Sequence, residues 1–128
     1  MIKKILTLVI FVFSTSLFAQ EMNWEEAMKM AQPSAQHKLL TDMVGKFTQK
    51  IKFNYAPGQF MEGDGAGETT SIIGGRFIQI KSIGKVMGME TEVMTIMGYD
   101  RRKDKYTLFS IDGMGTYSVS AEGDYDET

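Results

Sequence analysis

From residue 46 onwards, apolar and polar residues alternate in short runs that are separated by turn residues. An alternation with a period of two is typical of half-buried β-strands. The run 46–53 has Phe47 and Ile51 on one side and Lys50 and Lys52 on the other. Further runs follow at 68–83, 90–99, 106–111 and 116–122. Their close spacing favours hairpin connections, so the pattern predicts a mainly β protein with an antiparallel up-and-down meander that forms a complete or incomplete barrel.

The run 68–83 contains Gly74-Gly75 between two β-type segments, which is typical of a tight hairpin turn. A two-residue loop there would put Ile72 and Phe77 on one face and Ser71 and Ile78 on the other. Both faces are partly apolar, so the pattern leaves open which one points inward.

Two further segments complete the β-rich part. The segment 55–67 contains Pro57-Gly58 and three further glycines, so it is expected to be a loop. In the strand predicted at 90–99, Val93, Met97 and Tyr99 lie on one side, and Met94 lies with Ile96 on the other.

The part before residue 46 has helical periodicity. A short helix is predicted over 23–32, with Asn23 as N-cap and Pro33 ending it. A second is predicted from Ser34 to about Val44, packed as a plug against a sheet or barrel end. Before them, the segment 1–19 has two lysines and then a largely apolar stretch, which is typical of a secretory signal peptide. The expected organisation is therefore a signal peptide at 1–19, a helical segment at 20–45 and a β-meander domain at 46–128.

The last predicted strand is followed by the start of a turn, after about six strands. Ligand-binding up-and-down barrels usually have about eight strands. The expectation is therefore that C-terminal strands are lacking, or that an open sheet pairs with another copy in a homo-oligomer.

Composition narrows the function classes. The 128 residues include no cysteine and a single histidine, and the formal net charge is −2. A mildly acidic chain is a poor candidate for nucleic-acid binding. Without cysteine or a cluster of acids near His37, no metal site is expected. His37 is expected to cap or pack at a helix start, with an axial haem ligand as the alternative; no cofactor is expected.

The run Arg101-Arg102-Lys103 is bracketed by acids and is interpreted as a solvated turn. No stable membrane anchor is expected after signal removal, which predicts a periplasmic or secreted protein.

Several short motifs, taken in order, resemble the bacterial domain-of-unknown-function family 1579 over residues 36–126. They are His37-Lys38-Leu39-Leu40, Val44-Gly45-Lys46-Phe47, Gly74-Gly75-Arg76-Phe77, Gly98-Tyr99-Asp100 with Lys105-Tyr106, Ile111-Asp112-Gly113-Met114-Gly115-Thr116 and Glu122-Gly123-Asp124-Tyr125-Asp126. The resemblance implies a lipocalin-like fold whose members continue for several more strands. It implies no particular activity.

Two functions fit these observations. The first is a non-catalytic, exported β-barrel that binds a small apolar or amphipathic ligand. Arg76 at a barrel rim would pair with a carboxylate head group, and Tyr99 would add a hydroxyl donor. As the alternative, Arg76 pairs with a neighbouring acid and Tyr99 closes the core. The second function is an interaction or structural module that pairs through strand edges. The residues expected to bind the ligand are Arg76, Phe77, Met94, Met97, Tyr99, Phe109 and Tyr117.

Overall fold

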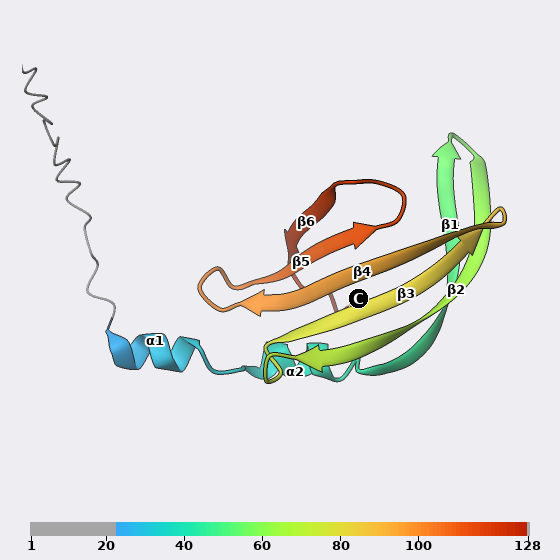
Figure 1. The fold of residues 1–128 in the computed structure, drawn as a ribbon. Helices are drawn as coiled ribbons and strands as arrows, with labels where there is room; N and C mark the ends of the chain where they lie inside the picture. Colours follow the sequence, from blue (N-terminus) through green and yellow to red (C-terminus); the bar gives the residue numbers. More distant parts are fainter. Residues whose placement is uncertain (1–22, 128) are drawn as a thin grey trace, which may run out of the picture.

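Six strands form one antiparallel sheet in the order of the chain, and the sheet curls into a half-barrel (Figure 1). The computed structural model describes residues 23–127. The predicted meander is confirmed. The strands are β1 (Gly45–Ala56), β2 (Gln59–Ile72), β3 (Phe77–Val86), β4 (Met89–Asp100), β5 (Lys105–Asp112) and β6 (Ser118–Gly123).

The prediction of a loop over 55–67 is wrong. Only the turn at Pro57-Gly58 interrupts the strands there, and Gly58 has a φ of 72°. The remaining glycines belong to β2, where Gly63, Gly65 and Gly67 pair with Ile51, Gln49 and Phe47 of β1. Since they lie two residues apart, they all point to the same face of the sheet.

These glycines make room for the curl of the sheet. The ring of Phe47 lies where a Cβ on Gly67 would be, and a Cβ on Gly84 of β3 would lie 2.6 Å from Cδ1 of Ile51. Side chains of β1 therefore cover backbone of β2 and β3 that carries no side chain on that face. The close approach explains why β1 contacts β3 although the two strands are not neighbours in the sheet. Figure 1 shows β1 and the adjoining part of β2 bending away from the direction in which β3 and β4 run.

The hairpin at Gly74-Gly75 is confirmed. The two glycines have φ values of 62° and 78°, and the amide of Arg76 donates to the carbonyl of Ile73 at 3.3 Å. Positive φ at both central residues matches the twist of a two-residue hairpin turn. The register then follows, with Ile72 opposite Phe77 and Ser71 opposite Ile78.

Both predicted helices are present, as α1 (Trp24–Met30) and α2 (Ala35–Thr41). Helix α2 contacts β3 and β4 on the concave side of the sheet, which agrees with its expected role as a plug. Leu40 of α2 is 3% exposed and Ile78 of β3 is fully buried. This contact places Ile78 on the inward face and Phe77 on the outward face. Within residues 23–127, neither helix has the length and apolar character needed to cross a bilayer. The predicted signal peptide at 1–19 lies outside the described residues.

Candidate functional site: the concave face and the end cleft

The two faces of the sheet differ in chemistry. The concave face, as defined by the pairing registers and by the burial of Ile78, is largely apolar. Apart from the positions that α2 covers, most of its side chains are half-buried. Its apolar residues are Phe47, Ile51, Phe53, Met61, Ile78, Ile80, Val86, Met89, Val93, Met97, Leu108, Val119 and Ala121, with Tyr99 and Tyr106 at one end.

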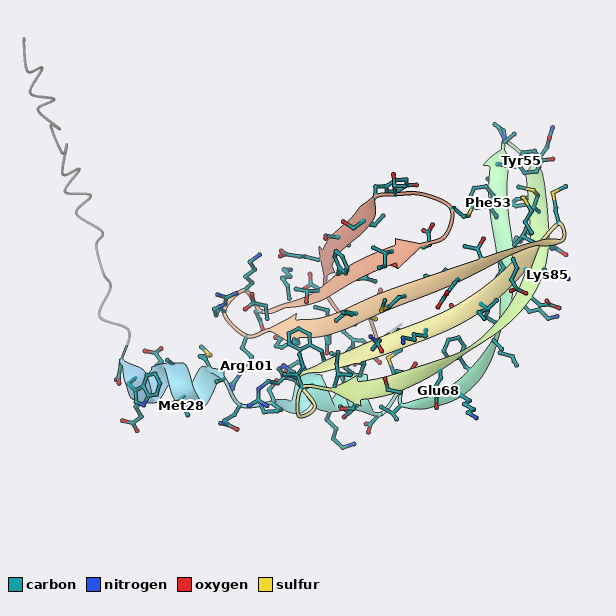
Figure 2. All side chains as sticks on the ribbon, viewed as in Figure 1. Met28, Phe53, Tyr55, Glu68, Lys85 and Arg101 are labelled. Carbon is teal, nitrogen blue, oxygen red and sulfur yellow. The ribbon has the colours of Figure 1, made fainter. Side chains whose placement is uncertain are left out.

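The convex face carries rows of opposite charges. Lys50, Asp64, Lys85 and Glu90 follow one another across β1 to β4 in register. Neighbouring opposite charges on one face stabilise a sheet that faces water. Figure 2 shows Lys85 and Glu68 pointing away from the sheet on this outer side. The charged rows lie over β1 to β4, whereas over β3 to β5 the convex face also carries apolar side chains such as Ile96 and Ile111.

The structure does not bring the seven predicted ligand residues together in one site. Met97 and Tyr99 lie on the concave face. Three others, Phe77, Met94 and Phe109, lie on the convex face. Arg76 lies in the turn before β3, and Tyr117 lies before β6 with 70% of its surface exposed.

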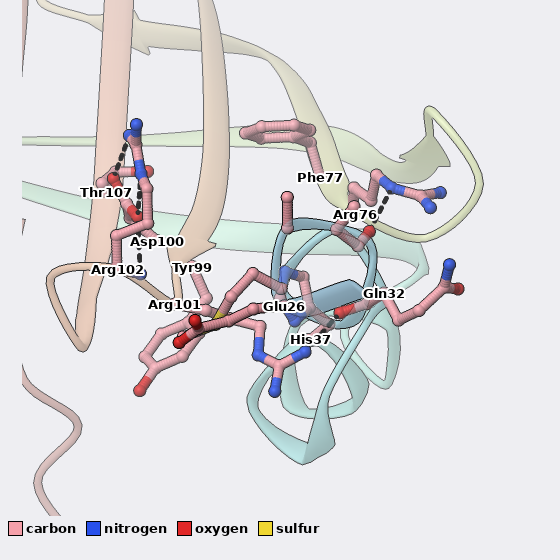
Figure 3. Close-up of a pocket in the computed structure, with 13 residues that line it drawn as sticks. Glu26, Gln32, His37, Arg76, Phe77, Tyr99, Asp100, Arg101, Arg102 and Thr107 are labelled. Atoms are coloured by element: carbon pink, nitrogen blue, oxygen red, sulfur yellow. Dashed lines mark hydrogen bonds and ion pairs between the residues drawn. The ribbon is translucent and has the colours of Figure 1, made fainter. Parts of the chain in front are cut away.

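An open cleft of about 810 Å³ lies between α1 and the ends of β3 and β4 (Figure 3). We call it the end cleft. Its lining comes from α1 and the segment after it, α2, the turn before β3 with the first residue of that strand, the end of β4 with the following turn, and β5. The residues are Glu26, Ala27, Met30, Ala31, Gln32, His37, Arg76, Phe77, Tyr99, Asp100, Arg101, Arg102 and Thr107.

Two arginines fasten the end of α1 to the sheet. Nε of Arg76 donates to the carbonyl of Ala31 at 3.0 Å. Nη1 of Arg101 donates to the carbonyls of Lys29 at 2.6 Å and Gln32 at 3.0 Å. The last carbonyls of a helix lack partners within the helix, so these guanidinium groups act as C-caps. Helix α1 buries no residue, and its Trp24 is 77% exposed, so the caps are its main attachment.

Residues 101–103 lie in a turn, as predicted, but Arg101 also bonds to the end of α1, which the sequence did not predict. Arg102 pairs with Asp100 at 2.7 Å. This guanidinium keeps the pKa of the Asp100 carboxyl far below its usual range. The expected alternative for Arg76, pairing with a neighbouring acid, is not what the structure shows, since Arg76 donates to backbone carbonyls. No local signal identifies Arg101, because its partners precede it by 69 and 72 residues.

His37 caps α2, as the sequence predicts. Its Nδ1 accepts from the backbone N–H of Ser34 at 3.0 Å, which leaves the proton of the neutral ring on Nε2. The ring contacts Tyr99 edge-on, with centroids 5.8 Å apart. Burial lowers the pKa of His37, and the positive charges of Arg101 and Arg76 lower it further. His37 is therefore neutral near pH 7 and experiences the charge of both arginines.

Two tyrosines close this end of the concave face. The hydroxyl of Tyr99 donates to the Asp104 carboxylate, and this bond raises the pKa of Tyr99 to about 12. The ring of Tyr106 lies 4.9 Å from that of Tyr99, and burial raises its pKa. Among the described residues, no group bonds to the buried Tyr106 hydroxyl. The sequence did not indicate that the Tyr106 hydroxyl would lie beside the apolar face.

No group of three or more His, Cys, Asp or Glu residues is placed to hold a metal ion within residues 23–127.

These features define an antiparallel half-barrel with a helical plug at one end and an apolar concave face. The chain belongs to the family described as a protein of unknown function (DUF1579), whose model matches residues 32–128. This match confirms the resemblance found in the sequence motifs. No curated protein and no solved structure matches the chain.

Proposed function

We propose that the protein is exported and binds a small apolar or amphipathic molecule on its concave face, without catalysing a reaction. The observation that carries the proposal is the contrast between the two faces of one curled sheet. Over β1 to β4 the convex face presents alternating charges to water, whereas the concave face of the same strands presents apolar side chains, with α2 packed over Ile78. Apolar, concave surfaces with few polar groups are typical of small-molecule sites.

The chemistry of the concave face favours a flexible apolar ligand. Met61 and Met97 are unbranched and adapt to ligands of different shape. Burying apolar surface contributes roughly 25 cal/mol per Å² to the free energy of binding. A hydrocarbon chain lying along these strands would therefore bind without specific polar contacts. The hydroxyl of Tyr106, which has no partner among the described residues, supplies a donor at one end.

Export is supported by the sequence alone. The segment 1–19 has the charge and hydropathy of a secretory signal, and a chain without cysteine needs no disulfide to fold in an oxidising compartment.

Titration with Nile red, a neutral apolar fluorophore, tests the proposal. We expect a saturable increase in fluorescence with the purified protein. In Met97→Gln, a polar amide replaces a thioether of similar shape on the concave face, so the dissociation constant should rise about fivefold to tenfold, because an amide is costly to bury. The matched control is Met94→Gln, on the same strand but the opposite face. Equal effects of the two substitutions, or no saturable binding, would contradict the proposal.

Pairing through strand edges is the second candidate. Strands β1 and β6 each have one neighbour in the described sheet, which leaves a row of backbone groups on each outer side. Such edges accept a further strand. However, β1 carries Lys46, Lys50 and Lys52, and lysines on an edge strand oppose pairing. A stable oligomer without ligand binding in sedimentation experiments would favour this candidate over the first.

A further inference from the structure

We propose that the end cleft binds the carboxylate of a small organic anion, with Arg101 and Arg76 attracting the charge and Phe77 and Met30 contacting the apolar part. This site adjoins the concave face, with which it shares Tyr99, but it does not depend on the function proposed for that face. The inference rests on the charge balance, donor capacity and apolar lining of the cleft.

The charges of Arg76 and Arg101 are not compensated by carboxylates. Their hydrogen bonds go to backbone carbonyls, which are neutral acceptors. Within residues 23–127, neither arginine has a carboxylate within 4 Å, whereas Arg102 is paired with Asp100. The other acid that lines the cleft is Glu26, and it is in no ion pair of the described residues. The cleft therefore keeps an excess of positive charge, although the chain as a whole is acidic.

Both guanidinium groups retain free donors. A guanidinium carries five N–H bonds. Arg76 uses Nε and Nη1, and Arg101 uses Nη1, so Nη2 of each has no partner among the described residues. The two arginines come from different turns, before β3 and after β4, and reach carbonyls of the four-residue segment 29–32. Both arginines therefore bring positive charge to the end of α1, and Figure 3 shows their guanidinium groups on different sides of it. His37 also lines the cleft, and its pKa is lowered by burial and then by the positive charges of Arg101 and Arg76.

The rest of the lining suits a short hydrocarbon chain. Ala27, Met30 and Ala31 come from α1 and the residue after it, and Phe77 lines the cleft from the start of β3. Figure 3 shows Phe77 beside the base of Arg76, so apolar surface begins next to the charged groups. Water-accessible guanidinium groups beside apolar side chains favour an amphipathic anion over an inorganic one.

Octanoate and 1-octanol, which differ in the charged group, test the inference by calorimetric titration. We expect octanoate to bind about tenfold more tightly in low-salt buffer, because charge-assisted hydrogen bonds to a carboxylate are the strong ones, and the difference should shrink as salt screens the charges. Arg101→Gln should reduce the affinity for octanoate to that for octanol. Equal affinities of the wild type for the two probes would overturn the inference.

Arg101→Gln also removes the two hydrogen bonds by which Arg101 holds the end of α1 and the residues after it, so a second pair of variants separates binding from folding. Glu26→Gln removes the unpaired negative charge from the cleft and touches no cap, and it should raise the affinity for octanoate about twofold to threefold. The control is Glu25→Gln, one residue earlier on α1 and not part of the lining, which should leave the affinity unchanged. No gain with Glu26→Gln, or the same gain with both variants, would overturn the inference.

The ring of His37 gives an independent readout, since it is the single histidine of the chain. The charged or titratable groups around it are Arg76, Arg101 and Tyr99, and Ser34 bonds to Nδ1. A bound carboxylate would offset the two positive charges and raise the pKa of His37, which NMR titration measures directly. The same pKa with saturating octanoate and with octanol would place the anion elsewhere and contradict the inference.

Discussion

Replacing Ile78 with alanine is expected to lower the free energy of unfolding by about 3–4 kcal/mol, the usual cost of removing a large aliphatic side chain from a packed interior. Ile78 is fully buried between β3 and the plug helix α2. Few residues of the described part of the chain are buried to this degree, because most of the concave face is half-exposed. Truncation would therefore leave a cavity at the main contact between the helix and the sheet. Urea denaturation followed by circular dichroism measures the change.

Ile83→Ala is the matched control. Ile83 lies on the same strand but on the convex face, where it is 49% exposed. Its truncation should cost less than about 1 kcal/mol, because little buried contact is lost. If the two variants were destabilised equally, α2 would not be packed on the face that contains Ile78.

Replacing Gly67 with valine is the substitution with the second large expected effect. A Cβ at this position would lie 2.5 Å from the Lys81 carbonyl oxygen and 2.8 Å from Cβ of Ser82, and it would overlap the ring of Phe47. Two of these neighbours belong to β3, and one of them is backbone, so the clash cannot be relieved by a rotamer change alone. Overpacking of this kind costs typically 1–3 kcal/mol, and we expect the upper end, with a fall in Tm of about 10–20 °C for a domain of this size.

Gly123→Val is the control that separates the effect of the clash from the different strand preferences of glycine and valine. Gly123 is also in a strand, and nothing lies within 4 Å of the position of its Cβ. Since valine favours strands and glycine does not, this variant should be neutral or slightly more stable. If Gly67→Val were as stable as the wild type, β1 and β3 would not approach Gly67 as closely as the structure shows.

The glycines of β2 also show where sequence reasoning stops. The alternation of apolar and polar residues predicted β3 and β4 and the faces of Met97 and Met94, because the period of a strand is a local property. The same reasoning treated Gly63, Gly65 and Gly67 as loop residues. Their role depends on side chains of β1 and on β3, which approach only after the sheet curls. A glycine at every second position is compatible with a strand bend as well as with a loop, and the sequence does not distinguish the two.

The candidate site was predicted less well than the fold, for the same physical reason. Phe77 and Ile78 are both apolar and adjacent, so neither pattern nor composition assigns one of them to the interior. The turn at Gly74-Gly75 fixes their pairing, and the contact between Leu40 and the sheet decides which face is covered. Arg101 has acidic neighbours in the sequence but acts on the end of α1, which no local pattern reveals.

The most direct test of the account is the location of a bound apolar molecule on one face of the sheet. The protein would be labelled with ¹³C at its methionine methyl groups and titrated with a neutral spin-labelled alkane, which broadens the NMR signals of nearby nuclei. Met61 and Met97 lie on the concave face, and Met94 lies on the convex face. We predict that the signals of Met61 and Met97 broaden at probe concentrations that leave Met94 sharp. Broadening of Met94 first, or of all three signals together, would contradict binding on the concave face.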